Sequence, residues 1–247
     1  MSNRPGRLVS AAMPLRPLPP TYTTTRDALH RLAVYVISPA QRLVNGEIVM
    51  RPTPGGFSTF PFEGRVVGVD GDRLVIDGSA RPIGSLNEAA AAVGVEPDVG
   101  QADQFDVPPP GDLDARLEVD AEAAAVLAAW YAYAGGLLEG LRRDASPADD
   151  PSPVWIWPEH FDIAFDGGDK DAGRRATYGA SPGDRHHDEP YLYASPWAGR
   201  IDPFFGDTSF KGASLLYPRI ADAADPEADG VAFYEQAREL VLRSPTA

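Results

Sequence analysis

Turn-forming residues divide this chain of 247 residues into short segments, and this division limits the folds that it can adopt. The clusters Thr53-Pro54-Gly55-Gly56 and Asp70-Gly71 each lie between two short, apolar-rich segments. Asp-Gly is favoured in tight hairpins because both central positions of such a turn take positive φ. We therefore predict a small antiparallel meander, with strands at 47–51, 57–62, 65–69 and 73–77.

Four segments indicate helices by their apolar spacing and their capping residues. The first is predicted to start near Thr24, with Asp27 completing a capping box, to kink or end at Pro39, and to stop at Gly46. The others are predicted at 86–93, after a capping box of Ser85 and Glu88, at 121–143, after the N-cap Asp120, and after the N-cap Asp225 with Pro226. Helices and strands in this order predict an α+β fold, with one or more antiparallel sheets packed against three to four helices.

The domain organisation follows from changes in composition along the chain. Prolines interrupt the N-terminus, so residues 1–22 are expected to form a disordered leader. An α+β half is predicted at 23–147, and an acidic, proline-containing segment then separates it from residues 153–247. This second half is predicted to be an antiparallel β half with a terminal helix, either as a separate domain or as part of one continuous domain. Its predicted strands are 154–165, 174–180, 190–197 and 210–217.

Composition excludes several classes of function. The chain carries 22 basic and 36 acidic side chains, for a net charge of −14, which repels phosphate backbones and anionic lipid headgroups. It has no cysteine, and no apolar run approaches the ~20 residues needed to span a bilayer. We therefore predict a cytoplasmic protein that binds neither nucleic acid nor membrane. No motif identifies a cofactor or an oligomeric state.

One polar constellation in the C-terminal third suggests a binding site. If 154–165 is one extended strand, His160 and Asp162 share a face with Cα atoms about 7 Å apart, close enough to converge on one ligand. A comparable row of alternating side chains follows in 190–197, namely Tyr191, Tyr193, Ser195 and Trp197. We predict that the two rows form a small-molecule pocket, in which His160 and Asp162 are the catalytic candidates and the second row binds the ligand.

Other interpretations of these residues remain open. His160 can instead be a structural histidine that is hydrogen-bonded to Asp162 or to a backbone carbonyl. With Asp162 and the run His186-His187-Asp188-Glu189 it could form a metal site, although adjacent residues on an extended chain point to opposite faces. By the same parity Glu159 is expected to face away from Asp162, and His30 is expected to be structural.

The strings WPEHFDIAF (157–165), YGASPGD (178–184) and EPYLYASPW (189–197) resemble an uncharacterised family of high-GC bacterial proteins. TTRDALHRLAVYVISPA and RPTPGGFSTFPF are similar to the front half of the same proteins. The resemblance covers most of the chain, and it implies no activity, cofactor or catalytic residue. The best functional prediction is therefore a small-molecule-binding protein or enzyme. The alternative is a non-catalytic protein-interaction or scaffold protein with an exposed aromatic and acidic surface.

Overall fold

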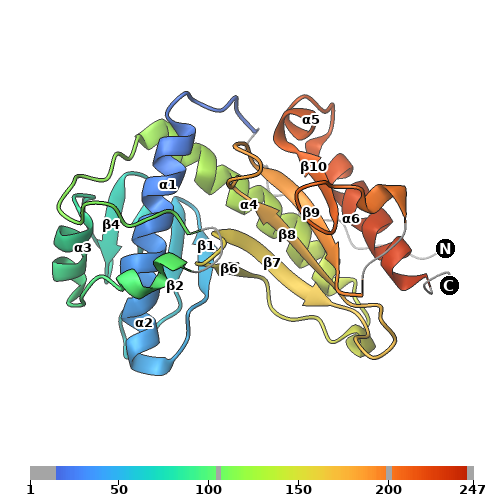
Figure 1. Ribbon diagram of the computed structural model, residues 1–247, viewed down its shortest axis with the longest axis horizontal. Coiled ribbons are helices and arrows are strands. Elements are labelled where there is room, and N and C mark those ends of the chain that lie inside the picture. Colours follow the sequence, from blue (N-terminus) through green and yellow to red (C-terminus); the bar gives the residue numbers. More distant parts are fainter. Residues whose placement is uncertain (1–14, 104–106, 199–201, 244–247) are drawn as a thin grey trace, which may run out of the picture.

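The computed structural model describes residues 15–103, 107–198 and 202–243. Within them, one antiparallel sheet has ten strands in the order β10-β9-β8-β7-β6-β1-β2-β3-β4-β5 (Figure 1). The strands of its N-terminal half are β1 (Met50–Thr53), β2 (Gly56–Thr59), β3 (Val67–Asp70), β4 (Arg73–Ile76) and β5 (Ser79–Pro82). Those of its C-terminal half are β6 (Trp155–Trp157), β7 (Asp162–Gly167), β8 (Ala176–Ser181), β9 (Tyr191–Pro196) and β10 (Ala213–Leu216). The α+β class and the antiparallel sheet are confirmed.

The two halves of the chain share this sheet. Strand β1 pairs with β6 through Met50 and Ile156, which places the predicted N-terminal meander beside the C-terminal strands. Strand β5 extends the meander and was not predicted. Most of the expected leader, residues 1–14, lies outside the described residues, but Tyr22 is already the first residue of a helix and is buried.

Helices cover one face of the sheet and pack around its N-terminal half. They are α1 (Tyr22–Leu32), the π-helical turn η1 (Ala33–Ile37), α2 (Ser38–Asn45), α3 (Leu86–Val93), α4 (Ala121–Arg143), α5 (Tyr217–Ala221) and α6 (Pro226–Leu242). Helix α4 crosses behind both halves of the sheet and contacts β1, β2, β7 and β8, while α6 contacts β9 and β10 (Figure 1). Trp130 and Tyr131 of α4 are fully buried in this core.

The first helical run differs from its prediction at both its start and its proline. It begins at Tyr22, so Thr24 lies inside the helix and the predicted capping box is wrong. Pro39 does not end the helical run. The π-helical turn η1 lies directly before α2, which contains Pro39 and continues to Asn45. Gly46 then takes the left-handed conformation, as expected. A proline has no N–H for the carbonyl four residues earlier, here that of Tyr35. The N–H of Asp98 donates to this carbonyl instead, at 2.9 Å.

The predicted long strand 154–165 is wrong and is replaced by a hairpin. Strands β6 and β7 pair with each other, with Trp157 opposite Asp162, and residues 158–161 form the turn between them. The N–H of Phe161 donates to the carbonyl of Trp157 at 2.7 Å, and Phe161 takes a left-handed φ of 55°. The Phe161 ring is stacked on His30 and has edge contacts with Phe57 and Tyr131, and this packing holds the unfavourable backbone.

Helix α4 is long and apolar enough to cross a membrane by length and composition, but 56% of its apolar window is buried inside the fold. Its buried residues belong to the core of the fold. Of its adjacent glycines, Gly135 approaches Ile163 of β7, so that an added Cβ would lie 3.3 Å from the Ile163 side chain. Gly136 has open space around it. Close packing therefore accounts for the first glycine only.

Replacing Asp120, the residue that caps α4, should destabilise the fold. Its side chain accepts a hydrogen bond from the N–H of Ala123 at 3.0 Å. Asp120→Ala should lower the free energy of unfolding by about 1 kcal/mol in urea denaturation, because a helix N-terminus loses one partner for its free N–H groups. Asp144→Ala, at the other end of α4, is the matched control and should cause no such loss, because a carboxylate opposes the helix dipole there. Equal losses in both variants would contradict this capping role.

Candidate functional site

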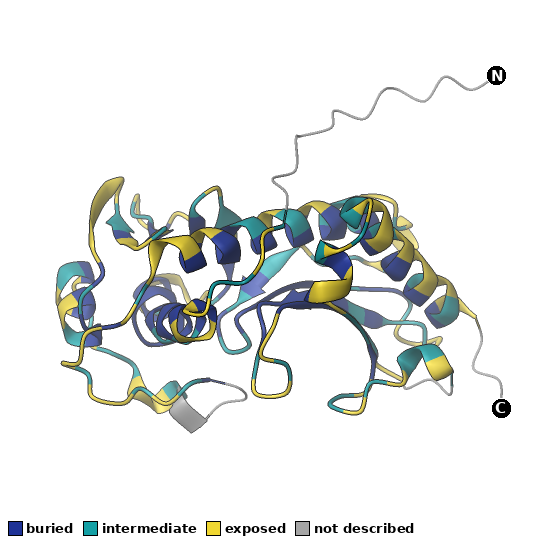
Figure 2. Cartoon of the chain, turned by 90° about the horizontal axis from the view of Figure 1, so that it is seen from above, coloured by how far each residue is buried: buried dark blue, intermediate teal, exposed yellow. Residues whose placement is uncertain are grey.

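A cavity of about 550 Å³ lies on the face of the C-terminal half-sheet that points away from α4. Figure 2 shows these strands curving into an arch, with the long helices along its outer side and loops projecting from its ends. The lining side chains come from strands β6 to β9, from the β6–β7 turn, from the β8–β9 loop and from residues 209–210. We call this space the concave cavity.

Strand register assembles the floor of the concave cavity. Asp162 of β7 lies opposite Trp157 of β6 and opposite Ser181 of β8, and Ser181 in turn lies opposite Tyr191 of β9. Residues in register share a face of the sheet, and these four all line the cavity. Their neighbours along the strands, such as Ile163, are buried toward the helices.

A hydrogen bond between Tyr193 and Asp162 spans the floor. Tyr193 of β9 pairs with Gly179 of β8, and its hydroxyl donates to Oδ2 of Asp162 on β7, two strands away. The ring must lie flat across β8 to reach that far. Gly179 permits this, because a Cβ there would be 2.4 Å from Cζ of the Tyr193 ring. The carbonyl of Gly179 is held from the other side by the hydroxyl of Tyr234 on α6, at 2.7 Å.

Asp162 is the buried charge of the site. Its side chain lines the cavity although the residue is only 7% exposed, and its Oδ1 has no hydrogen-bond partner among the described residues. Burial raises its pKa from the ordinary 3.8 to about 6, although the nearby His160 and the hydrogen bond from Tyr193 both act to lower it. At neutral pH the carboxyl is therefore mainly ionised, and it can accept a proton close to the physiological range.

His160 lies in the β6–β7 turn, not on a strand. Phe161 points into the core, and the residues on either side of it, His160 and Asp162, both line the concave cavity. The prediction that these two face one hollow thus agrees with the structure, but the alternation argument behind it does not. Glu159, which was expected on the opposite face, also lines the cavity. Its Oε2 is a second buried carboxylate oxygen with no hydrogen-bond partner among the described residues.

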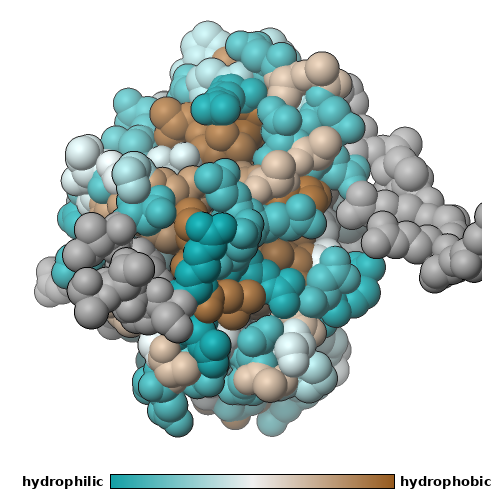
Figure 3. All heavy atoms as spheres, turned by 90° about the vertical axis from the view of Figure 1, so that its right-hand side faces the viewer, coloured by the Kyte–Doolittle hydropathy of each residue, from teal (hydrophilic) through white to brown (hydrophobic). Residues whose placement is uncertain are grey.

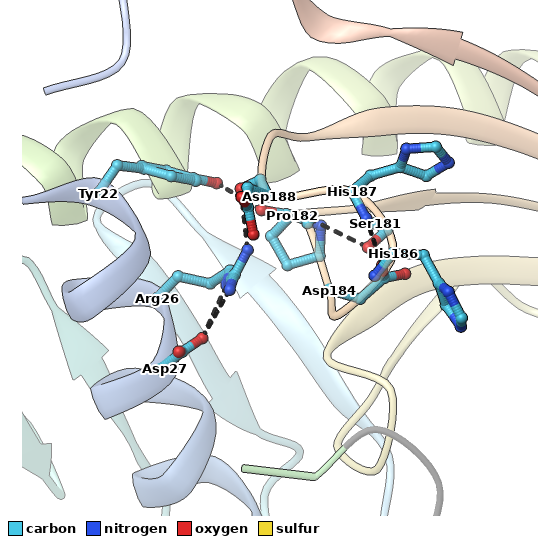
Figure 4. Close-up of polar contacts among 10 residues, drawn as sticks. Tyr22, Arg26, Asp27, Ser181, Pro182, Asp184, His186, His187 and Asp188 are labelled. Carbon is cyan, nitrogen blue, oxygen red and sulfur yellow. Dashed lines mark hydrogen bonds and ion pairs between the residues drawn. The ribbon is translucent and has the colours of Figure 1, made fainter. Parts of the chain in front are cut away.

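Helix α1 holds one end of the cavity in place (Figure 4). The hydroxyl of Tyr22 donates to the carbonyl of Pro182 at 3.0 Å, and the guanidinium of Arg26 donates to the carbonyl of Asp188 at 2.9 Å. His30 forms a 2.8 Å hydrogen bond with the carbonyl of Pro158, and burial lowers its pKa to about 3, so it is neutral and structural, as predicted. The β6–β7 turn and the β8–β9 loop are thus both fixed to one helix.

Asp184 organises the β8–β9 loop at the rim. Its Oδ1 accepts hydrogen bonds from the backbone N–H groups of His186 and His187, at 2.7 and 3.0 Å, and its Oδ2 accepts one from the hydroxyl of Tyr191 at 2.6 Å. The two adjacent imidazoles diverge in Figure 4. His186 is exposed at the cavity, whereas His187 contacts the Tyr191 ring.

The described residues contain no group of three or more His, Cys, Asp or Glu side chains placed to hold a metal ion. The observed arrangement is a polar loop that shapes the rim of the cavity.

The predicted second row is only partly at the cavity. Tyr191, Tyr193 and Ser195 line it, and Ser195 also donates to the carbonyl of Lys211 at 3.0 Å. Trp197 does not line it: this residue follows the last residue of β9, is 50% exposed and donates from Nε1 to Oγ1 of Thr177. The prediction extended the alternation of β9 to Trp197, but side chains need not alternate beyond the end of a strand.

Several lining residues were missed by the sequence analysis. Trp157 and Phe210 supply aromatic surface, Thr177 and Ser181 supply hydroxyls, and Asp166 accepts a 2.7 Å hydrogen bond from Thr177. Alternation within the separate strands could have found Ser181 and Thr177. Trp157 lies opposite Asp162 because of the β6–β7 hairpin, whereas on one continuous strand the two residues would face opposite sides.

The burial of Asp162 predicts a specific pH dependence of stability. Because its folded-state pKa is raised, the folded protein binds this proton more tightly than the unfolded chain, and the wild type loses stability as the pH rises from 3.8 to about 6. Asp162→Asn removes this titration. The free energies of unfolding of the variant and of wild type are measured by urea denaturation at each pH. The difference, variant minus wild type, should rise by about 3 kcal/mol between pH 3.8 and about 6 and then stay level.

Asp207→Asn provides a control of opposite sign. Burial acts to raise the pKa of Asp207, but hydrogen bonds from the Ser214 hydroxyl and the Ser209 N–H lower it overall. This variant should lose stability relative to wild type as the pH rises. Parallel curves for wild type and Asp162→Asn would show that Asp162 is not a buried carboxylate with a raised pKa.

No protein-family model matches this chain, and no curated protein or solved structure matches it either. The assignment of the site therefore rests on the residues of the chain itself. Carboxylates, hydroxyls and aromatic rings converge on one hollow of the sheet, and this composition is typical of a site for a small polar molecule.

Proposed function

We propose that this protein binds a small molecule in the concave cavity, with Asp162 as the polar anchor of the site. The observation that carries the proposal is the buried Asp162 carboxylate: Asp162 lines the cavity, and its Oδ1 has no hydrogen-bond partner among the described residues. A buried ionised group costs several kcal/mol unless it is paired or solvated, so folds rarely retain one without a use. A ligand that hydrogen-bonds to Oδ1 would supply the missing partner.

The size and the walls of the cavity support the same proposal. A volume of about 550 Å³ is within the range of small-molecule sites. The rings of Tyr191, Tyr193 and Phe210 lie with their centroids 6.0 to 6.2 Å apart and give an apolar wall beside the carboxylate. Such a combination of apolar walls and a few fixed polar groups gives affinity and orientation together.

Chemistry at the site would use His160 and Asp162. Both line the cavity, and His160 is close enough for its charge to lower the pKa of the Asp162 carboxyl. A bound molecule would therefore meet an imidazole beside a carboxyl group whose pKa is raised to about 6, a pair of groups suited to proton transfer. In an enzyme, Asp162 would act as the proton acceptor and His160 as the proton donor.

The alternative of a protein-interaction surface has less support. The exposed large hydrophobic side chains of the described residues come from separate places along the chain, namely Leu43, Val44, Val99, Trp197, Leu216 and Leu242. On the C-terminal side of the molecule, hydrophobic residues form separate patches divided by hydrophilic ones (Figure 3). Protein-binding surfaces more often present one contiguous apolar patch.

A ligand screen with a blocked cavity tests the proposal. Ser195→Trp places an indole at the cavity wall, while Ser79→Trp places one on the exposed strand β5 and serves as its control. In a thermal-shift screen against organic cations, carboxylates, sugars and nucleosides, at least one compound should raise the melting temperature of wild type and Ser79→Trp but not of Ser195→Trp. If no compound distinguishes the two tryptophan variants, the cavity is not a binding site.

Two histidine variants separate a binding role from a structural one. His160→Ala should reduce the shift caused by a compound found in that screen and change the melting temperature of the free protein by only a few degrees. His30→Ala should lower the melting temperature much more, because His30 is buried, stacked on Phe161 and hydrogen-bonded to Pro158. Extensive unfolding of His160→Ala would instead identify His160 as a structural residue.

A further inference from the structure

The charged side chains that line the concave cavity limit which class of ligand can bind there. Among the described residues, four carboxylates line it, those of Glu159, Asp162, Asp166 and Asp184, whereas Arg185 alone brings a permanent positive charge to the lining. Arg185 is exposed, and its Nε lies 3.2 Å from Nε2 of His186. The floor of the cavity is therefore negative, and an anionic ligand would be repelled there.

The carboxylates differ in how far the protein already satisfies them. Asp184 accepts two backbone N–H groups and the Tyr191 hydroxyl, and Asp166 accepts the Thr177 hydroxyl. The two that remain incomplete lie together at the β6–β7 turn. Oδ1 of Asp162 and Oε2 of Glu159 are both buried, and neither has a hydrogen-bond partner among the described residues. A carboxylate oxygen only accepts hydrogen bonds, so the missing partner must be a donor.

The wall formed by the rings of Tyr191, Tyr193 and Phe210 also favours a positively charged ligand. The faces of Tyr and Trp rings attract cations, and three aromatic rings surround the acidic floor on the β9 side. Tyr193 is both a ring of this wall and the hydrogen-bond donor to Asp162, so the wall and the anchor are adjacent. A positively charged donor bound at Oδ1 of Asp162 would have its hydrocarbon part against these rings.

We infer that the concave cavity recognises an organic cation, with an ammonium or guanidinium group bound to Asp162 and Glu159 and an apolar part packed on Tyr193 and Phe210. This inference rests on the proposed function, since it names the class of ligand for the same cavity. Binding would pair the buried carboxylate with a charge-assisted hydrogen bond, the strongest type open to it. A neutral or anionic molecule of the same shape would leave that carboxylate unpaired.

Three probes of nearly equal size and different charge test the inference: 2-phenylethylammonium, 2-phenylethanol and phenylacetate. Their dissociation constants are measured by calorimetry at about pH 8, well above the pKa of about 6 of Asp162, so that its carboxyl group is ionised. The ammonium probe should bind wild type at least tenfold more tightly than the alcohol, and phenylacetate should bind most weakly. Asp162→Asn should abolish the preference, and Glu159→Gln, a second variant in case the first is unstable, should reduce it.

Two controls separate the possible outcomes. Asp222→Asn removes a negative charge from an exposed position and should leave the preference unchanged. If Ser195→Trp prevents binding but the three probes bind wild type equally, or the anion binds best, the cavity is a ligand site and the inference about charge is wrong. If none of the probes binds wild type, the inference about an organic cation is contradicted, whereas the proposed function is contradicted only if the thermal-shift screen also finds no compound that Ser195→Trp excludes. An ammonium preference that persists in Asp162→Asn and in Glu159→Gln would also overturn the assignment.

Discussion

The hydrogen bond between Tyr193 and Asp162 is the interaction on which the site depends. It joins β9 to β7 across the whole width of β8, and it forms only because Gly179 leaves room for the Tyr193 ring. The bond fixes the orientation of a carboxyl group that the fold has removed from water. It satisfies Oδ2 of Asp162 and leaves Oδ1 without a hydrogen-bond partner among the described residues, so the same contact fixes the carboxyl group and leaves one of its oxygens unpaired.

The surrounding fold holds the backbone of this site with the polar ends of buried tyrosines. The Tyr131 hydroxyl on α4 donates to the carbonyl of Phe161 at 2.6 Å, and the Tyr234 hydroxyl on α6 donates to that of Gly179. On the other side, α1 binds the two loops that border the cavity. The β6–β7 turn, strand β8 and the β8–β9 loop are therefore each tied to a helix of the core. A binding site supported in this way can hold a charged group at low mobility.

Local signals in the sequence predicted much of the fold. The capping box of Ser85 and Glu88, the N-caps Asp120 and Asp225 and the left-handed Gly46 all lie where their patterns placed them, because each involves residues that are neighbours in sequence. The run through Pro39 and the β6–β7 hairpin could not be found in this way. A distant N–H from Asp98 compensates the proline, and the hairpin turn contains no glycine.

The hairpin explains which part of the site could be predicted. The left-handed residue of its turn is Phe161, a residue type that rarely adopts that conformation, and it is held there by rings from α1, β2 and α4. Such packing is invisible in a local pattern. By contrast, Tyr191, Tyr193 and Ser195 were placed together because β9 is a regular strand, and the parity of a regular strand is readable from its sequence.

The most direct test of this account is a titration of the Asp162 side chain itself. Carboxyl ¹³C chemical shifts, followed by NMR across the acidic and neutral range and assigned by comparison with Asp162→Asn, report its protonation in the folded protein. The account predicts a midpoint at about pH 6, well above the ordinary value of 3.8. A midpoint at or below the ordinary value would show that the carboxyl is solvated or already fully paired, and the cavity would then have no anchor for a ligand.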